Sequence, residues 1–186
     1  MTSNKRKIIA VLGMPGSGKT NAINYLMKKF GWPKVYFGEV TFDEMKKRGL
    51  EINEKNERFV REDLRKNFGK TYYAEKVVEK IKALSVDSDI LVESLYMWEE
   101  YLALKKEFRE ELITVAIYAS PKIRYERLAK RPERPLTFEE VYSRDCSQIE
   151  NLTQGGPIAM ADYTIDNNGT LDEFFAQIDK IVEKIG

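Results

Sequence analysis

The sequence contains no histidine and a single cysteine, Cys146, among its 186 residues. Without an imidazole, histidine-based triads, His-ligated zinc sites and acid–base catalysis by histidine are excluded. A single cysteine cannot form a disulfide within the chain. Any chemistry must therefore rest on carboxylates, lysines, arginines, hydroxyls and backbone groups.

The chain also lacks an excess of one charge and any long apolar run. Its 31 Lys and Arg residues almost balance its 30 Asp and Glu residues, so we do not expect nucleic acid or an anionic membrane as a partner. No apolar run has the length of a membrane span, and residues 1–13 lead into a short strand rather than a signal peptide. We therefore expect a cytoplasmic protein with one domain over residues 1–186, a monomer or a homodimer.

Short apolar runs alternate with helical patterns along the chain. The runs have the length and the branched or aromatic content of buried strands and cover residues 7–13, 34–38, 89–93, 111–119 and 162–166. Strands that alternate with helices predict parallel pairing through right-handed crossovers. The expected fold is α/β, a three-layer sandwich with a five-stranded parallel sheet, whose ligands bind beyond the carboxyl ends of the strands.

The stretch VLGMPGSGKT, residues 11–20, fits the pattern G-x-x-x-x-G-K-[ST]. The flanking strand and helix are the context that indicates a P-loop. Glycines allow unusual backbone angles, so successive N–H groups can surround phosphate oxygens, while Lys19 reaches the outer phosphates and Thr20 binds Mg²⁺. The predicted nucleotide-binding residues here are Gly13, Pro15, Gly16, Ser17, Gly18, Lys19 and Thr20. The phosphates are expected to be those of ATP or GTP.

Charged side chains elsewhere complete the predicted site. Glu93 ends an apolar strand that we expect beside the P-loop strand, where a carboxylate can hold Mg²⁺ or its waters. Arg127 and Arg131 lie four apart on one predicted helix, hence on one face, and can neutralise charge on a transferring phosphoryl group. Arg144 would add a third guanidinium. Taken singly, each of these arginines also suits a surface ion pair.

Two segments interrupt the alternation of strands and helices. Residues 38–70 form a long charged helical insertion, and residues 130–148 are rich in arginine and broken by prolines. Arg61 and Arg65 have helical spacing in the first segment and could clamp an acceptor phosphate, although they also suit a plain solvated helix. Tyr96, one of several aromatic residues, could stack on a base or simply pack in the core.

Together these motifs resemble one family of enzymes. The stretches are GMPGSGKT, FGEVTFDEMKKRG, LVES, SPKIRYERLAKR, RDCSQ and ADYTIDNNGTLDEF. The chain resembles P-loop kinases of the nucleoside monophosphate kinase group, most closely dephospho-CoA kinase and small uncharacterised proteins similar to it or to adenylate kinase. The resemblance implies a P-loop NTPase fold with an acceptor-binding lobe at 38–84 and a lid at 130–150.

The same resemblance suggests roles for single residues. Arg127 and Arg131 match paired helix arginines that contact nucleotide and phosphates, and Arg144 belongs to an R-x-x-x-Q motif after the lid. Asn168 and Gly169 match a loop whose backbone lies by adenine. Glu39 takes the place of an aspartate near the acceptor hydroxyl. The segment after Glu93 lacks the arginine of the D-G-x-P-R motif of adenylate kinases, so an ordinary nucleoside monophosphate is a doubtful acceptor.

The expected function is transfer of the γ-phosphoryl group from ATP, with Mg²⁺, to a nucleotide-like small molecule. The acceptor group expected here is a neutral hydroxyl, with Glu39 as its base or orienter, but Arg61 and Arg65 could instead clamp an acceptor phosphate, so the sequence leaves both open. Two alternatives remain. One is a nucleotide-dependent regulatory ATPase or switch, although no D-x-x-G follows Glu93. The other is a kinase that acts on a modified nucleotide in DNA.

Overall fold

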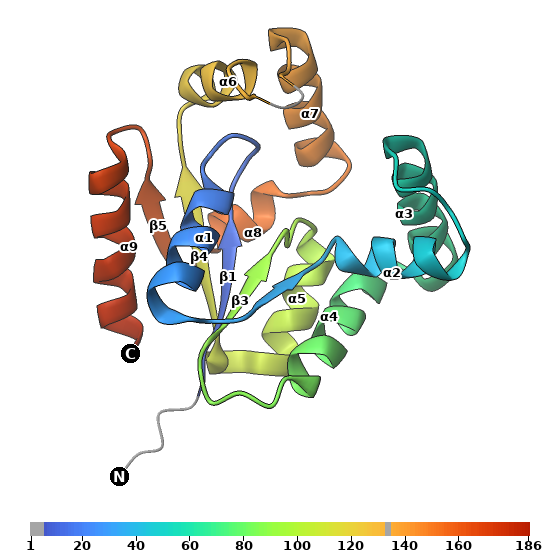
Figure 1. Cartoon of the computed structure of the whole chain (residues 1–186), viewed down its shortest axis with the longest axis horizontal. Helices are drawn as coiled ribbons and strands as arrows, with labels where there is room; N and C mark the ends of the chain where they lie inside the picture. The colour runs from blue at the N-terminus through green and yellow to red at the C-terminus, as the bar shows by residue number, and fades with distance from the viewer. Residues whose placement is uncertain (1–5, 133–134) are drawn as a thin grey trace.

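The computed structural model describes residues 6–132 and 135–186. Its sheet confirms the predicted fold class: five parallel strands in the order β2-β3-β1-β4-β5 (Figure 1). The strands are β1 (Ile8–Leu12), β2 (Lys34–Tyr36), β3 (Ile90–Glu93), β4 (Leu112–Tyr118) and β5 (Tyr163–Asp166). The strand β1 is buried along its whole length because β3 and β4 flank it, which explains its continuous apolar sequence.

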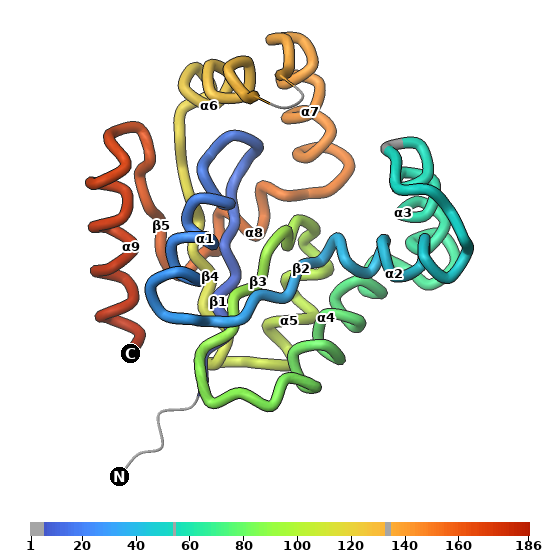
Figure 2. Tube along the Cα trace, in the orientation of Figure 1, coloured from blue at the N-terminus to red at the C-terminus, as the bar shows by residue number. Residues whose placement is uncertain are grey.

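Helices cover both faces of the sheet, so the molecule has three layers (Figures 1 and 2). They are α1 (Lys19–Phe30), α2 (Glu39–Lys47), α3 (Glu54–Phe68), α4 (Tyr72–Ala83), α5 (Trp98–Phe108), α6 (Pro121–Ala129), α7 (Phe138–Glu150), α8 (Gly155–Ala159) and α9 (Leu171–Ile185), with a 3₁₀ turn at Arg109–Glu111. Capping boxes begin α7 at Thr137 and α9 at Thr170, and Pro121 stands in the first turn of α6.

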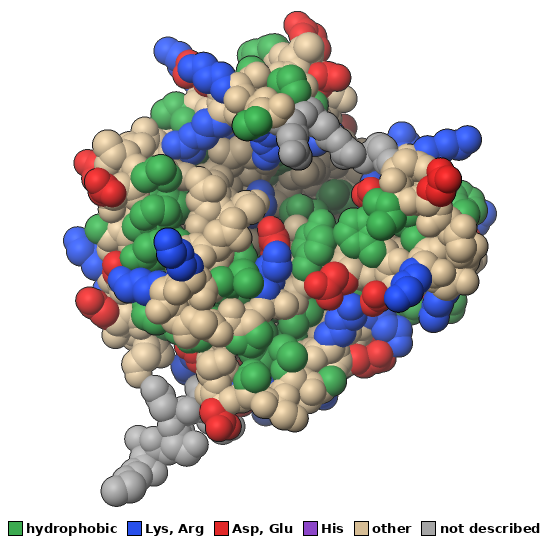
Figure 3. Space-filling view, in the orientation of Figure 1, with side chains coloured by type: hydrophobic (Ala, Val, Ile, Leu, Met, Phe, Trp, Pro, Cys, Tyr) green, Lys and Arg blue, Asp and Glu red, His purple; other side chains and the backbone are tan. Residues whose placement is uncertain are grey.

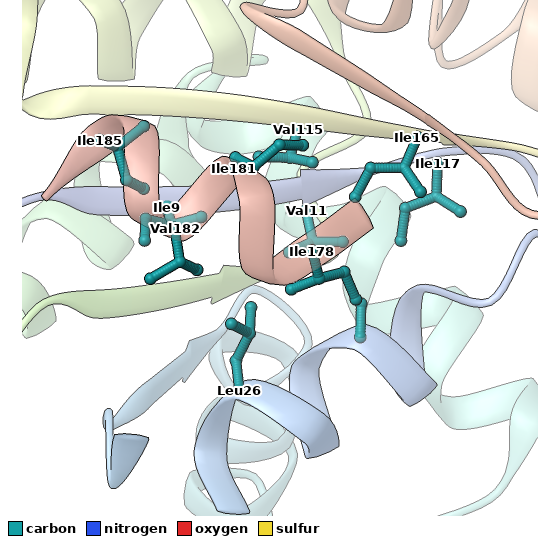
Figure 4. A pocket seen from close by; sticks show the side chains of 11 residues that line it. Ile9, Val11, Leu26, Val115, Ile117, Ile165, Ile178, Ile181, Val182 and Ile185 are labelled. Carbon is teal, nitrogen blue, oxygen red and sulfur yellow. The ribbon is translucent and has the colours of Figure 1, made fainter. Parts of the chain in front are cut away.

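Side-chain alternation along β1 divides the core into two parts. Ile8 and Ala10 pack in one cluster with residues of α4 and α5, while Ile9 and Val11 pack in the other with residues of α1 and α9. The second part contains a void of about 20 Å³ between α9, α1 and the sheet, shown in Figure 4. Its lining is entirely aliphatic, so the void is a dry packing gap rather than a ligand site.

Two groups of helices lie beyond the carboxyl ends of the strands. Helices α2 and α3 follow β2, while α6 and α7 follow β4, and Figures 1 and 2 show α3 and α7 facing each other across the sheet edge. The first group lies within the segment predicted as the acceptor lobe, 38–84, whose last helix, α4, packs against the sheet. The second includes α7 within the predicted lid, 130–150, of which residues 133–134 lie outside the described part.

Candidate functional site

The loop between β1 and α1 has the backbone that a P-loop requires. Gly13, Gly16 and Gly18 all have positive φ, at 140°, 77° and 108°. A Cβ would also collide at each position. It would lie 2.5 Å from the carbonyl oxygen of Ile117 at Gly13, and 2.8 Å from that of Arg124 at Gly16. Glycine is therefore needed here both for backbone conformation and for close packing.

Lys19 is held against this loop. Its Nζ donates hydrogen bonds to the carbonyl oxygens of Gly13 and Met14, at 2.7 and 3.1 Å. Burial lowers the pKa of Lys19 to about 8. The carboxylate of Glu93 opposes this decrease, and the nearby guanidiniums of Arg124 and Arg131 add to it. The ammonium is thus a partly desolvated cation whose charged form an incoming phosphate would stabilise.

Nucleotide affinity should therefore depend on pH above about 8. At pH 7 Lys19 is mostly protonated in the free protein, but as pH rises through its lowered pKa the ammonium loses its charge before phosphates bind. Affinity for an ATP analogue should fall by up to about tenfold per pH unit between 8 and 9.5, measured by titration calorimetry. Lys19→Arg keeps its charge throughout and should remove this slope. The same slope in the variant would assign it to another group.

Thr20 and Glu93 are placed where the sequence predicted a Mg²⁺ site. The Thr20 side chain is exposed in the first turn of α1, and Glu93 ends β3, paired with β1 in the predicted order. Both line one cavity. Oε2 of Glu93 accepts a hydrogen bond from Nζ of Lys34 at 2.7 Å. Among the described residues no three His, Cys, Asp or Glu side chains cluster, so this donor set suits a Mg²⁺ that also uses phosphate and water ligands.

The cavity beside the P-loop, called here the P-loop cavity, measures about 650 Å³. It brings together most of the predicted donor-site residues: Pro15, Gly16, Gly18, Lys19, Thr20, Glu93, Arg127, Arg131 and Arg144, together with Tyr96, which was predicted on the acceptor side. Figure 3 shows the surface hollowed between α7 and α3. Gly13 and Ser17 are buried behind the loop. The cavity is large enough for a nucleotide.

The three predicted arginines reach the P-loop cavity from different positions. Arg127 lies on α6, and its Nη2 donates to the carbonyl oxygen of Asn167 at 2.8 Å, while its buried Nη1 has no hydrogen-bond partner among the described residues. The helix ends at Ala129, so the prediction that Arg131 shares its face is wrong in detail: Arg131 follows the helix end. Arg144 is exposed on α7. All three still line the same cavity.

The loop after β5 differs from its predicted arrangement in one respect. Asn167, not Asn168 or Gly169, lines the P-loop cavity, and its Nδ2 donates to the carbonyl oxygen of Ser17 at 2.7 Å. Asn168 instead accepts a hydrogen bond from the backbone N–H of Ser120 at 2.8 Å. Asn168 and Gly169 line a shallow depression on the neighbouring surface. Their proximity to adenine stays a prediction.

A second cavity, the lobe cavity, measures about 270 Å³ and lies between the sheet edge and helices α2 to α5. Arg61 and Arg65 enter it from α3, as predicted for acceptor-binding residues, opposite Tyr96. The remaining aromatic lining is Tyr36, Phe37, Phe42 and Tyr73. The two cavities share four residues, namely Tyr36, Ser94, Tyr96 and Gln148, so they adjoin.

Arg65 and Glu100 form the charged floor of the lobe cavity. Glu100 is buried, and its Oε2 accepts hydrogen bonds from the backbone N–H groups of Tyr96 and Met97 at 3.4 and 3.1 Å. Nη2 of Arg65 lies 3.4 Å from Oε1 of Glu100. Burial raises the pKa of Glu100, and Arg65 opposes this. Nε of Arg65 is buried with no partner in the described part of the chain, which leaves a donor for an anion.

Ser94 stands where the two cavities meet and has an unusual backbone. Its φ is 70°, a left-handed conformation that costs energy in a residue other than glycine. The Tyr96 hydroxyl donates to Oγ of Ser94 at 3.0 Å. The strained turn places both side chains at the junction, between the P-loop and the arginines of α3.

Glu39 does not reach either cavity. The strand β2 ends at Tyr36, and Glu39 is the first residue of α2. Its Oε2 instead accepts a hydrogen bond from Nζ of Lys80 on α4 at 3.1 Å. The carboxylate is half exposed on the outer side of the lobe, which corrects its expected position beside an acceptor hydroxyl.

Sequence reasoning missed Arg124, Asp145 and Gln154. All three are buried, and Arg124 and Gln154 contact the P-loop backbone. Arg124 lies in the motif SPKIRYERLAKR, three residues before Arg127. The sequence of this motif does not show that Arg124 is buried. Gln154 carries no sequence signal, because the residue that it contacts, Gly13, is 141 positions away.

Comparison with known proteins agrees with this geometry. Residues 9–149 match a family described as an AAA domain. The UPF0200 protein TK1334 of Thermococcus kodakarensis is 37% identical over 182 residues, which cover 96% of this chain and 97% of the relative. The chain belongs to the UPF0200 family. A second UPF0200 protein, from Hyperthermus butylicus, is 33% identical over 187 residues, 100% of this chain and 98% of its own.

Solved structures share the fold of this UPF0200 protein at low sequence identity. A gluconokinase from Sinorhizobium meliloti 1021 superposes with a TM-score of 0.58 at 16% identity, over 97% of each chain. A shikimate kinase from Acinetobacter baumannii, in complex with shikimate, also gives 0.58 at 17% identity, over 98% of this chain and 94% of its own. These similarities establish a P-loop kinase-like fold. No described helix of this UPF0200 protein is long and apolar enough to cross a membrane.

Proposed function

We propose that this protein is an ATP- and Mg²⁺-dependent kinase that transfers the γ-phosphoryl group to an anionic, nucleotide-like small molecule. The observation that supports it most is the pair of adjoining cavities, one beside the P-loop lysine and one containing Arg61 and Arg65. A hydrolase needs only the first cavity. The folds shared with a gluconokinase and a shikimate kinase, both small-molecule kinases, support the same reading.

In this proposal the P-loop cavity holds ATP. Backbone N–H groups of the loop residues other than Pro15 surround the phosphates, and Lys19 exchanges its carbonyl partners for phosphate oxygens. When bound through Thr20 and Glu93, Mg²⁺ supplies charge neutralisation on the phosphates. The side chains of Arg131 and Arg144 then face the transferring group, where charge develops.

The lobe cavity holds the acceptor. Its volume of about 270 Å³ lies near the lower end of small-molecule sites, which begin at about 300 Å³. Aromatic side chains such as Tyr36 and Phe42 can flank a planar ring, and Arg65 retains an unpartnered Nε for an anionic group. This combination of rings and guanidiniums suits a nucleotide-like anion.

The carboxylates around the cavities favour an acceptor oxygen that is already ionised. Among the described lining residues, Glu57 lies 3.4 Å from Arg61, Glu100 pairs with Arg65, and Glu93 pairs with Lys34. None is placed as an unpaired base for a hydroxyl. A phosphate is largely ionised at neutral pH and needs positioning rather than a base. In the transfer, an acceptor phosphate oxygen bonds to the γ-phosphorus as the bond to the β–γ bridging oxygen breaks, releasing ADP.

An acceptor screen tests the proposal. The protein, with Mg²⁺ and a non-hydrolysable ATP analogue, is heated with candidate nucleoside monophosphates, other phosphorylated nucleotides, and hydroxyl compounds of similar size. The true acceptor should raise the melting temperature by mass action and then accept phosphate from ATP. Arg61→Ala and Arg65→Ala should raise the KM for this acceptor about tenfold or more, with a smaller effect on the KM for ATP.

Arg58→Ala is the matched control. Arg58 lies on the same helix, 73% exposed, and lines neither cavity. It should leave the acceptor KM unchanged. Equal effects of all three arginine variants would remove α3 from the acceptor site. ATP hydrolysis that no acceptor increases, in a protein that no acceptor stabilises, would replace the kinase by the regulatory ATPase.

A further inference from the structure

We propose that Arg124, Asp145 and Gln154 are positioning residues that hold the P-loop and helix α7 in one fixed arrangement. They orient the amides of the loop toward the position of bound phosphates. They also place Arg144 and Gln148 beside that position. The expected effect on catalysis rests on the proposed kinase function. The arrangement of the P-loop and α7 concerns nucleotide binding alone and does not depend on an acceptor.

Arg124 joins three parts of the chain. It is 5% exposed, and its Nη1 donates to the carbonyl oxygen of Pro15 in the P-loop at 3.0 Å. Nε donates to the carbonyl oxygen of Ala119 at the end of β4 at 3.2 Å. Nη1 and Nη2 bind both carboxylate oxygens of Asp145 on α7, at 3.0 and 2.6 Å. This bidentate geometry fixes orientation as well as distance.

Asp145 determines how α7 faces the P-loop cavity. Its side chain is 10% exposed and also accepts a hydrogen bond from the Tyr125 hydroxyl at 3.2 Å. Arg144 precedes it, and Gln148 lies about one turn further on, and both line the P-loop cavity. A helix anchored at Asp145 therefore presents these two side chains at a fixed rotation. Removing the anchor would let α7 turn or shift.

Gln154 holds the segment after α7 to the other end of the loop. It is fully buried, and its Nε2 donates to the carbonyl oxygen of Gly13 at 2.9 Å, the same oxygen that accepts from Lys19. Its own N–H donates to the carbonyl oxygen of Gln148 at 3.0 Å. The end of α7 is thus tied to the first glycine of the P-loop.

The orientation of the loop amides follows from peptide geometry. In a planar trans peptide the carbonyl oxygen of one residue and the N–H of the next point in opposite directions. A hydrogen bond from Gln154 to the carbonyl of Gly13 therefore fixes the N–H of Met14, and one from Arg124 to the carbonyl of Pro15 fixes that of Gly16. Both amides belong to the loop that is expected to bind phosphate. Preorganised donors of this kind need no reorientation when phosphate arrives.

The test uses two mild variants and one control. Asp145→Asn keeps the shape but removes the charge that pairs with Arg124, and Gln154→Ala removes only the contact with Gly13. Asp162→Asn is the control, because Asp162 accepts hydrogen bonds from Thr114 at the opposite end of the sheet. Amide hydrogen exchange is measured at residues 13, 14, 16–18 and 138–150, with Mg²⁺ and a non-hydrolysable ATP analogue, and kcat is measured with the true acceptor.

Asp145→Asn and Gln154→Ala should each increase exchange in the loop at least about threefold, and Asp145→Asn should also do so along α7. Each should lower kcat about tenfold with a smaller change in the KM for the acceptor. If either variant exchanges and turns over like Asp162→Asn, the residue has only a general structural role and the proposal fails for it. If the wild-type protein phosphorylates no acceptor, the proposed function fails, while the exchange data still decide this inference.

Discussion

Lys19→Ala is expected to abolish phosphoryl transfer while leaving the fold intact. The ammonium is the only described lysine group that lines the P-loop cavity, where it contacts the carbonyls of Gly13 and Met14. Its removal takes away the positive charge that would hold the outer phosphates and neutralise the developing charge on the transferred group. We expect kcat to fall by about a thousandfold or more, measured as ADP release with the acceptor present.

Folding of the Lys19→Ala protein should be nearly unaffected, because Lys19 belongs to neither hydrophobic cluster. Circular dichroism and the melting temperature without nucleotide check this. Lys28→Ala is the control: Lys28 is exposed at the other end of the same helix and should leave turnover unchanged. A purified Lys19→Ala protein with undiminished kcat would contradict the assignment of the P-loop as the phosphate site.

The fold could be predicted because its signals are local. A strand buried on both faces leaves a continuous apolar run, as at β1 and β3, and each of the five predicted runs contains an observed strand. The ends of the strands could be predicted less well, because an apolar run can continue past the strand. Phe37 is buried and apolar like its strand neighbours, but α2 begins two residues later, so the run overstated the length of β2.

In the candidate site, too, the residues with local sequence signals could be predicted and the others could not. The P-loop is contiguous in sequence, and the end of β3 follows from the strand order, so Lys19, Thr20 and Glu93 were predicted and lie together. Contacts between distant residues left no pattern. Arg124 and Asp145 join α6 and α7 although they are 21 positions apart in the sequence. The residue type alone does not show whether a charged side chain is buried or exposed. The resemblance to kinases also predicted Glu39 beside an acceptor hydroxyl, whereas Glu39 begins α2 and pairs with Lys80.

The two adjoining cavities give the proposed phosphoryl transfer a route that the sequence could not supply. Among the described residues, Tyr36, Ser94, Tyr96 and Gln148 line both the P-loop cavity and the lobe cavity. In the proposed transfer, the phosphoryl group would cross this junction between the two cavities. Gln148 has a buried Oε1 without a hydrogen-bond partner in the described part of the chain, so the junction retains an acceptor for a ligand group.

Arg131→Ala should lower kcat by about a hundredfold with a smaller change in affinity for ATP. Arg131 is exposed at the mouth of the P-loop cavity, and its charge acts on Lys19, where it helps to lower the pKa of that group. Because no contact between Arg131 and the P-loop is found among the described residues, its removal should cost stabilisation mainly when charge develops on the transferring group. Steady-state kinetics with the true acceptor, together with calorimetric titration of an ATP analogue, separate the two effects.

Two variants show whether position or charge matters at Arg131. Lys130→Ala removes a neighbouring exposed cation that does not line the cavity, so it should leave kcat unchanged. Arg131→Lys keeps the charge but loses the planar fork that binds two phosphate oxygens, and should therefore recover only part of the lost rate. Full activity in Arg131→Ala would make Arg131 a surface residue. The charge on the transferring group would then fall to Arg127 and Arg144, the two remaining arginines of the described cavity lining.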